Sequence, residues 1–258
     1  MKVRWQSYIE PGTAYLDVLG RHLRELASPE TEVELAGLTP SDAHVHVLSE
    51  WRCGYQVVAQ NLVDRDCDAL VVGHFQDGGV RELRAALDIP VVGLGEAAMH
   101  HAAMLGESFG LVTINPGFVT FHRRQVHSYG LGAQCAGIRA MQTDAPAYLA
   151  AFAGDSAAAD RILSAFRVAA RDLVDAGADV IVPAGGLPAL LLRRLPDAVP
   201  ELDGAAVLDP LGIALGQAEL WARLGAGAAP GRRAIYARPR PGVVEDFLGL
   251  VHPDRLSP

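Results

Sequence analysis

The fold is decided by the stretch DALVVGHFQDGG, residues 68–79, and by its echo DVIVPAGGLPAL, residues 179–190. Each stretch begins with an aspartate, continues through an apolar run and ends in small residues that lead into a predicted helix. A continuous apolar run of this length is typical of a parallel strand covered on both faces. The pair predicts two similar halves with a strand, a loop and a helix at matching places. The alternative is that both are ordinary strand–loop–helix units of one α/β domain.

The rest of the chain alternates in the same way, which predicts an α/β fold with parallel strands joined by helical crossovers. Strands are predicted at residues 2–8, 32–38, 69–75, 90–94, 109–114, 137–141, 178–183 and 206–208. Helices are predicted near residues 14–27, 50–65, 79–87, 96–105, 117–129, 158–176, 187–195 and 211–224. A glycine- and proline-rich loop at 225–231 follows, and then PRPGVVEDFLGLV, residues 239–251, which could form a short amphipathic helix.

Composition narrows the class of protein and of partner. Of the 258 residues, 50% are hydrophobic and 20% are charged, which is typical of a soluble globular protein. The formal net charge of -8 disfavours nucleic acid and anionic membrane surfaces as partners. The three cysteines show no metal or disulfide spacing, and no apolar segment has signal-peptide or membrane-spanning length. We therefore expect a cytoplasmic protein that acts on a small molecule.

The first strand end carries a candidate base. His74 follows the apolar run and precedes Gly78 and Gly79, so its ring is expected at the edge of the sheet where ligands gather. Histidine, with an ordinary pKa of about 6.5, can take up and return a proton near neutral pH. We assign His74 as catalytic and Phe75 beside it as substrate-binding. A structural loop histidine is the alternative.

The matching strand end in the second half offers backbone rather than side-chain chemistry. Gly185 and Gly186 let main-chain N–H groups approach a carboxylate or a developing oxyanion closely. A tight turn is the other reason for two glycines at this place. Gln6, Ser7 and Thr113 supply neutral hydrogen bonds at equivalent strand ends, and we include them among the substrate-binding residues.

Two competing motifs are weak. VVGLGEAA, residues 91–98, fits a dinucleotide pattern, but Glu96 would lie near the pyrophosphate and the next strand has no acidic residue for the ribose. His44 and His46 could share a face, yet no carboxylate or cysteine completes a metal spacing. We expect no cofactor and no metal. A nucleophile elbow and a P-loop are also missing from the sequence.

The motifs together resemble a known family. The two strand ends, followed in order by FGLVTI, GADVIVPAGG and AVLDPLGIALGQAE, are similar to the aspartate/glutamate/hydantoin racemase superfamily, most of all to its hydantoin racemase-like branch. The resemblance implies two Rossmann-like lobes related by a pseudo-twofold axis, an active site between them and catalysis without a cofactor. It divides the chain into a first lobe of residues 1–105 and 206–224, a second lobe of 106–205, and an extension of 225–258. It is also compatible with a homo-oligomer.

This sequence departs from the family at the catalytic positions. Racemases of the superfamily use two cysteines, one on each lobe, which correspond here to His74 and to Gly185 or a neighbour within 184–186. The two-thiol mechanism therefore does not carry over, and one base remains on one face. His122 or His127, on the helix after the FGLVTI strand, is a candidate for the second proton donor.

The three cysteines are not expected to replace the lost thiols. Cys67 precedes His74 by seven residues, which places it roughly 23 Å away along an extended strand. Cys53 lies within a predicted helix, and Cys135 follows a glycine turn. We interpret Cys53 and Cys135 as buried or incidental thiols, and we expect Cys67 at the opposite edge of the sheet from His74.

The leading hypothesis is a cofactor-independent isomerase or racemase that acts on a small carboxylate or carbonyl compound through an enolate-like intermediate. A decarboxylase or another carbon–carbon lyase in the same cleft is one alternative. A non-catalytic carboxylate-binding protein is a second, and a metal-assisted hydrolase that uses the histidines is a third.

Overall fold

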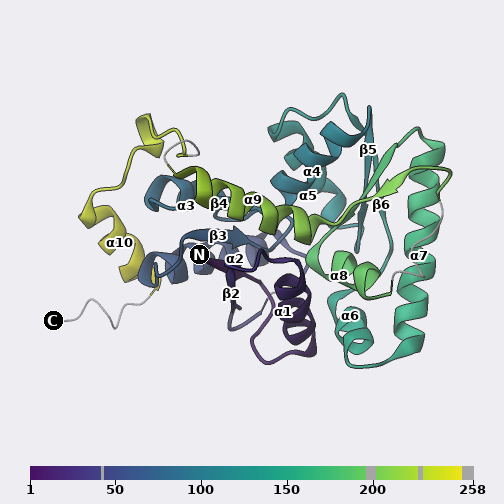
Figure 1. The fold of residues 1–258 in the computed structure, drawn as a ribbon, viewed down its shortest axis with the longest axis horizontal. Helices are drawn as coiled ribbons and strands as arrows, with labels where there is room; N and C mark the ends of the chain where they lie inside the picture. Colours follow the sequence, from purple (N-terminus) through teal and green to yellow (C-terminus); the bar gives the residue numbers. More distant parts are fainter. Residues whose placement is uncertain (42–43, 196–201, 226–228, 252–258) are drawn as a thin grey trace.

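The computed structural model describes residues 1–41, 44–195, 202–225 and 229–251. Within these residues the strands form two parallel sheets of four strands, with the orders β2-β1-β3-β4 and β6-β5-β7-β8. The second sheet therefore repeats the strand order of the first, and the two sheets lie side by side in the chain's two halves (Figure 1). The predicted α/β fold of two Rossmann-like lobes is confirmed.

The elements have the following bounds. The first sheet contains β1 (Lys2–Gln6), β2 (Glu32–Ala36), β3 (Ala69–Val72) and β4 (Val91–Gly93), and the second contains β5 (Phe109–Thr113), β6 (Cys135–Ala140), β7 (Val180–Ala184) and β8 (Ala206–Val207). The helices are α1 (Ala14–Leu26), α2 (Val47–Val63), α3 (Val80–Ala86), α4 (Leu94–Leu105), α5 (Phe118–Ser128), α6 (Ala145–Phe152), α7 (Ser156–Asp175), α8 (Gly186–Arg194), α9 (Pro210–Leu224), η3 (Ala234–Tyr236) and α10 (Pro241–Val251).

Apolar strands and capped helices explain this arrangement. Every residue of β3, β5 and β7 is buried, as expected for parallel strands with helices on both faces. Side-chain oxygens of Thr13, Asp144, Asp155 and Asp209 accept backbone hydrogen bonds at the starts of α1, α6, α7 and α9. Such caps satisfy N–H groups that a helix leaves unpaired in its first turn.

Three details differ from the sequence prediction. Helix α6, residues 145–152, was not predicted, because its APAYLAAF sequence has no polar face to give a helical period. Helix α2 begins at Val47 because the ring of His46 accepts a hydrogen bond from the N–H of Leu48 and caps the helix. Strand β8, residues 206–207, was assigned to the first lobe but pairs with β7 of the second sheet.

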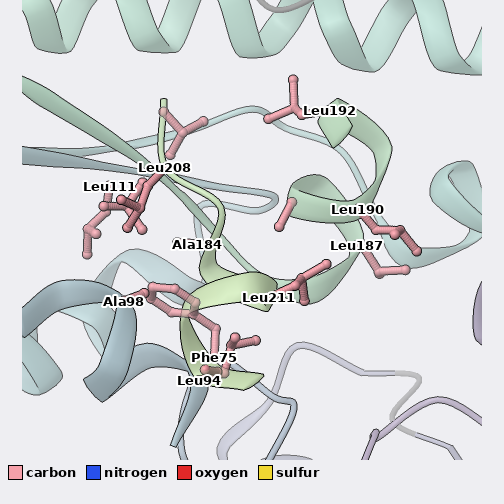
Figure 2. Packing of buried hydrophobic residues seen from close by; sticks show 14 of the residues in the cluster. Phe75, Leu94, Ala98, Leu111, Ala184, Leu187, Leu190, Leu192, Leu208 and Leu211 are labelled. Carbon is pink, nitrogen blue, oxygen red and sulfur yellow. The ribbon is translucent and has the colours of Figure 1, made fainter. Parts of the chain in front are cut away.

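The return to the first lobe is made by α9, which packs against α4, β3 and β4. One apolar core joins the two lobes. Phe75, Leu94 and Ala98 of the first lobe lie opposite Ala184 and Leu187 of the second in Figure 2. All five side chains are buried, so the lobes are held in a fixed relation by shared packing.

The segment after α9 lies on the outer side of the first lobe (Figure 1). The helix predicted within residues 239–251 forms as α10 and packs against α2, where the rings of Tyr55 and Phe247 meet edge to face at 4.5 Å. Residues 226–228 of the predicted loop and 252–258 of the predicted extension lie outside the described residues. In the described part of the chain, no helix is long and apolar enough to span a lipid bilayer.

Candidate active site

A cavity lies between the two lobes at the carboxyl ends of the strands. It contains about 830 Å³ of space, counting its opening to solvent, which suits a small molecule. Loops and turns that follow β1, β2, β3, β5, β6 and β7 all contribute to its wall, and α1 contributes Tyr15. His74, Ser7, Phe75, Gly185 and Gly186, predicted from the sequence as site residues, line it together.

His74 is held in place by a buried carboxylate and an aromatic ring. Its Nε2 lies 3.1 Å from Oε2 and 3.4 Å from Oε1 of Glu50, a residue of α2 whose side chain is only 8% exposed. The imidazole stacks on the ring of Tyr8, with centroids 3.9 Å apart and planes within 6°. The Tyr8 hydroxyl donates to the carbonyl of Gly78 at 3.1 Å.

This arrangement defines what the imidazole can do. An ionised carboxylate only accepts hydrogen bonds, so Nε2 is the donor to Glu50. His74 therefore has the geometry of an oriented general base, in which the carboxylate stabilises the imidazolium formed when a proton is taken up.

The second-lobe wall is formed by backbone. Gly185 follows β7 with a φ of +156°, where an L side chain is strained, and an added Cβ would lie 3.1 Å from Cδ of Pro188. Gly186 is the first residue of α8, and no side chain caps this helix. The N–H groups of its first turn, together with the helix dipole, favour a negative charge or a polarised carbonyl oxygen in front of them.

Gln6 and Thr113 do not line the cavity, although both were predicted as substrate-binding residues. Both are almost completely buried, because the side chains of these terminal strand residues point into the lobes. The amide oxygen of Gln6 accepts a hydrogen bond from Asn61 at 3.1 Å, and its amide nitrogen donates to the carbonyl of Ser7 at 3.2 Å. Thr113 hydrogen-bonds to a histidine behind the wall.

That histidine is His122, which connects α5 to the first lobe. Its Nε2 lies 3.0 Å from Oγ1 of Thr113, and its Nδ1 lies 2.9 Å from Oε1 of Gln125. The Gln125 amide donates at 2.6 Å to the carbonyl of Phe75, so its oxygen accepts from Nδ1 of His122. Burial lowers the pKa of His122 to about 4, which keeps the ring neutral. His127 is exposed on α5, and neither candidate second donor lines the cavity.

The dinucleotide-like stretch has a structural role. Gly95 and Glu96 lie in the first turn of α4, and their N–H groups donate to the carboxylate of Asp77 at 2.9 and 2.7 Å. The Tyr129 hydroxyl donates to the same carboxylate at 2.7 Å. Burial raises the pKa of Asp77 to about 7 against these hydrogen bonds. The N–H groups that could meet a pyrophosphate are therefore already occupied by a side chain.

The three cysteines lie away from the cavity, and His44 and His46, which the sequence suggested could share a face, have different positions. Cys53 is buried in α2, Cys67 precedes β3 and Cys135 begins β6, and none of the three is among the described residues that line the cavity. His44 lines the cavity, whereas His46 caps α2. Among the described residues, no three His, Cys, Asp or Glu side chains are grouped so that they could hold a metal ion.

Three side chains at the site were missed by the sequence analysis. Glu50 and Tyr8 fix His74, and Tyr15 contributes to the cavity wall from the first turn of α1. Each approaches the site through tertiary packing rather than through a motif. Glu50 had a weak signal in the sequence, as an acidic residue on the apolar side of a predicted helix.

Comparison with known proteins agrees with this architecture. The sequence model of the Asp/Glu/hydantoin racemase family matches residues 11–218. The chain belongs to this family. A hydantoin racemase from Rhizobium meliloti is 31% identical over 173 residues, which make up 67% of this chain and 67% of that protein. A hydantoin racemase from a Pseudomonas strain, NS671, is 36% identical over 72 residues, or 28% of this chain and 29% of its own length.

Solved structures give the same picture at the level of the fold. An allantoin racemase from Klebsiella pneumoniae superimposes with a TM-score of 0.74 at 26% identity, covering 93% of this chain and 94% of its own. An allantoin racemase from Pseudomonas fluorescens also gives 0.74, at 25% identity, with 93% and 98% covered. The similarity of these relatives covers both lobes.

Proposed function

We propose that this protein is a cofactor-independent racemase that moves a proton at the carbon next to a carbonyl group, in a small ring compound of the hydantoin type. The observation that carries the proposal is the His74–Glu50 pair at the wall of a cavity between the lobes. Relatives named as hydantoin and allantoin racemases support the racemase assignment over a lyase.

The chemistry of the cavity wall supports a neutral ring over a dicarboxylate. None of the described residues that line the cavity is a lysine or an arginine. Two substrate carboxylates would be buried there without a cation, and an unpaired buried charge is strongly unfavourable. The wall carries apolar side chains instead, among them Val45, Phe75, Phe118 and Leu187. These suit a ring with an apolar substituent at the reacting carbon.

In the proposed mechanism, His74 removes the proton from that carbon. Because Nε2 faces Glu50, the proton is taken up at Nδ1, and the carboxylate stabilises the resulting imidazolium. The electron pair of the broken C–H bond moves to the carbonyl oxygen and forms an enolate. Backbone N–H groups at the start of α8 stabilise negative charge that develops there. A water molecule in the cavity gives a proton to the opposite face of the carbon, and the hydroxide left behind takes the proton from the imidazolium, so inversion is complete and His74 is neutral again.

The test uses optically pure 5-benzylhydantoin in heavy water at pH 7, with exchange in protein-free buffer subtracted. We expect loss of optical rotation together with deuterium at C5, and we expect His74→Ala to reduce the rate by about 10²- to 10⁴-fold. His127→Ala, an exposed histidine of α5, is the matched control and should keep the wild-type rate. Wild-type activity in His74→Ala would overturn the assignment, and binding without exchange would favour a carboxylate- or carbonyl-binding protein.

A further inference from the structure

Tyr15 presents an unused hydrogen-bond donor to the cavity. It lies in the first turn of α1, is only 2% exposed and lines the cavity wall. Its ring is held against Phe152 of α6, with centroids 5.4 Å apart. No other described residue forms a hydrogen bond with its hydroxyl, although a buried phenol usually has a partner. The hydroxyl is therefore available to a ligand or to water in the cavity.

The Tyr15 hydroxyl fills the space that a side chain at Gly186 would need on the second-lobe wall. A Cβ added to Gly186 would lie only 2.6 Å from the Tyr15 hydroxyl oxygen and 3.6 Å from the carbonyl oxygen of Gly73. At Gly185 the backbone angle and Pro188 disfavour any side chain. The polar side chain at this part of the wall therefore comes from α1, because the β7–α8 turn has no space for a side chain of its own.

Other polar groups at the wall have different properties. Asp144 accepts the N–H of Ala147 at 2.9 Å as the cap of α6, and a carboxylate cannot donate to a carbonyl. Oγ of Ser7 accepts the N–H of Ile9 at 3.1 Å in a local turn. Tyr15 combines a donor, a fixed ring and a place beside the first turn of α8, where the mechanism above puts negative charge.

We propose that the Tyr15 hydroxyl donates a hydrogen bond to the substrate carbonyl oxygen and holds the enolate oxygen as it forms. This inference rests on the proposed function. When the C–H bond breaks, the proton goes to His74, the electron pair goes to the carbonyl oxygen, and Tyr15 keeps its own proton. Burial raises the pKa of Tyr15, so the phenol remains a donor at neutral pH.

The principal test is Tyr15→Phe, which removes one oxygen and keeps the ring packed on Phe152. We expect kcat for C5 exchange of 5-benzylhydantoin to fall by about 10²- to 10³-fold, as for loss of one oxyanion donor. KM should change far less, because the hydrogen bond strengthens as charge develops. Tyr148→Phe is the matched control, since this buried tyrosine of α6 lies outside the cavity wall and should keep wild-type kinetics.

A second variant separates contact from general damage. Gly186→Ala places a methyl group against the Tyr15 hydroxyl and should displace it, so kcat should fall. In the Tyr15→Phe background this methyl would lie 3.8 Å from the nearest ring carbon, an ordinary contact, and the same substitution should cost little more. Such non-additivity is expected only if the two positions act through one contact. Additive losses would overturn the inference.

Binding distinguishes failure of this inference from failure of the proposed function. Calorimetric titration with hydantoin itself should give about 2- to 10-fold weaker binding for Tyr15→Phe than for the wild type. If wild type exchanges C5 and Tyr15→Phe does so equally fast, the Tyr15 role is wrong and the racemase proposal stands. If wild type binds without exchange and Tyr15→Phe binds more weakly, the racemase proposal fails and the donor role stands. Equal binding without exchange, or no binding, overturns both.

Discussion

Replacing Glu50 by glutamine removes the negative charge beside His74 and keeps a side chain of nearly the same size. The carboxylate accepts from Nε2 of His74 at 3.1 Å, and both side chains are largely buried, at 8% and 18% exposed. Water therefore screens the pair only weakly. The amide oxygen of glutamine can still accept the hydrogen bond, so the ring should keep its orientation while the imidazolium loses its counter-charge.

The expected loss follows from the energy of one charge-assisted hydrogen bond. Such a bond contributes about 1.5–3 kcal/mol, and each 1.4 kcal/mol changes a rate constant about tenfold. Because glutamine keeps a neutral hydrogen bond worth about 0.5–1.5 kcal/mol, the loss is about 1–1.5 kcal/mol, and Glu50→Gln should reduce kcat/KM for C5 exchange by roughly 5- to 12-fold. The measurement is proton NMR of the C5–H signal of 5-benzylhydantoin in heavy water, from pH 6 to 9.

A matched control tests whether the loss of activity is specific to the carboxylate beside His74 or follows from removing any partly buried carboxylate of the first lobe. Glu96→Gln removes a carboxylate that accepts from Arg84 at 2.6 Å and lies outside the cavity wall, and it should leave exchange unchanged. Thermal unfolding of both variants checks that the fold is intact. The reasoning is refuted if Glu50→Gln keeps the wild-type kcat/KM, or if its activity falls only in proportion to the folded fraction.

Three further predictions concern stability. Gly95→Ala would place a Cβ 2.1 Å from the carbonyl oxygen of Phe75, so urea unfolding should show a loss of about 1–3 kcal/mol, and an unchanged midpoint would contradict the close approach. Phe247→Ala removes the edge-to-face contact with Tyr55 and should cost about 1 kcal/mol in the same assay, whereas no loss would mean that α10 contributes nothing to the first lobe. The pKa of His122 is lowered to about 4 by burial, so between about pH 6.5 and 4 the unfolded chain binds a proton there that the folded chain does not. The free energy of unfolding should fall by up to about 3 kcal/mol as pH is lowered through this window, and His122→Gln should lack that part of the slope.

The fold could be predicted because its strands are uninterrupted apolar runs with clear boundaries. Strands β3 and β7 lie where the two opening stretches placed them, and their shared place in the two sheets explains the echo between the stretches. Helix α6 was missed because a helix that is apolar all round carries no amphipathic signal. Strand β8 has two residues, too few for its sheet to be chosen from sequence alone.

The site was predictable only as far as it depends on topology. Parallel strands end at one edge of a sheet, so the loops after β1 and β3 lie together in the first sheet. The loop after β7 lies at the matching edge of the second sheet, and Ser7, His74 and Gly185 line one cavity because the two edges face each other. Side-chain direction was not predictable at the strand ends, and Gln6 and Thr113 point inward. The partners of His74 come from helices and loops that approach only in the folded protein.

The two halves share a topology but differ at equivalent strand ends, and this difference has a chemical consequence. His74 follows the third strand of the first sheet, whereas Gly185 follows the third strand of the second. Ionising a carbon next to a carbonyl needs a proton acceptor at the carbon and a hydrogen-bond donor at the oxygen, which are opposite roles. Two strand ends with the same residue would supply two groups with the same chemical role. Here one end supplies an imidazole backed by Glu50, and the other leaves room for the hydroxyl of Tyr15. The asymmetry therefore matches the division of charge in an enolate, with a proton acceptor at the carbon and a hydrogen-bond donor at the oxygen.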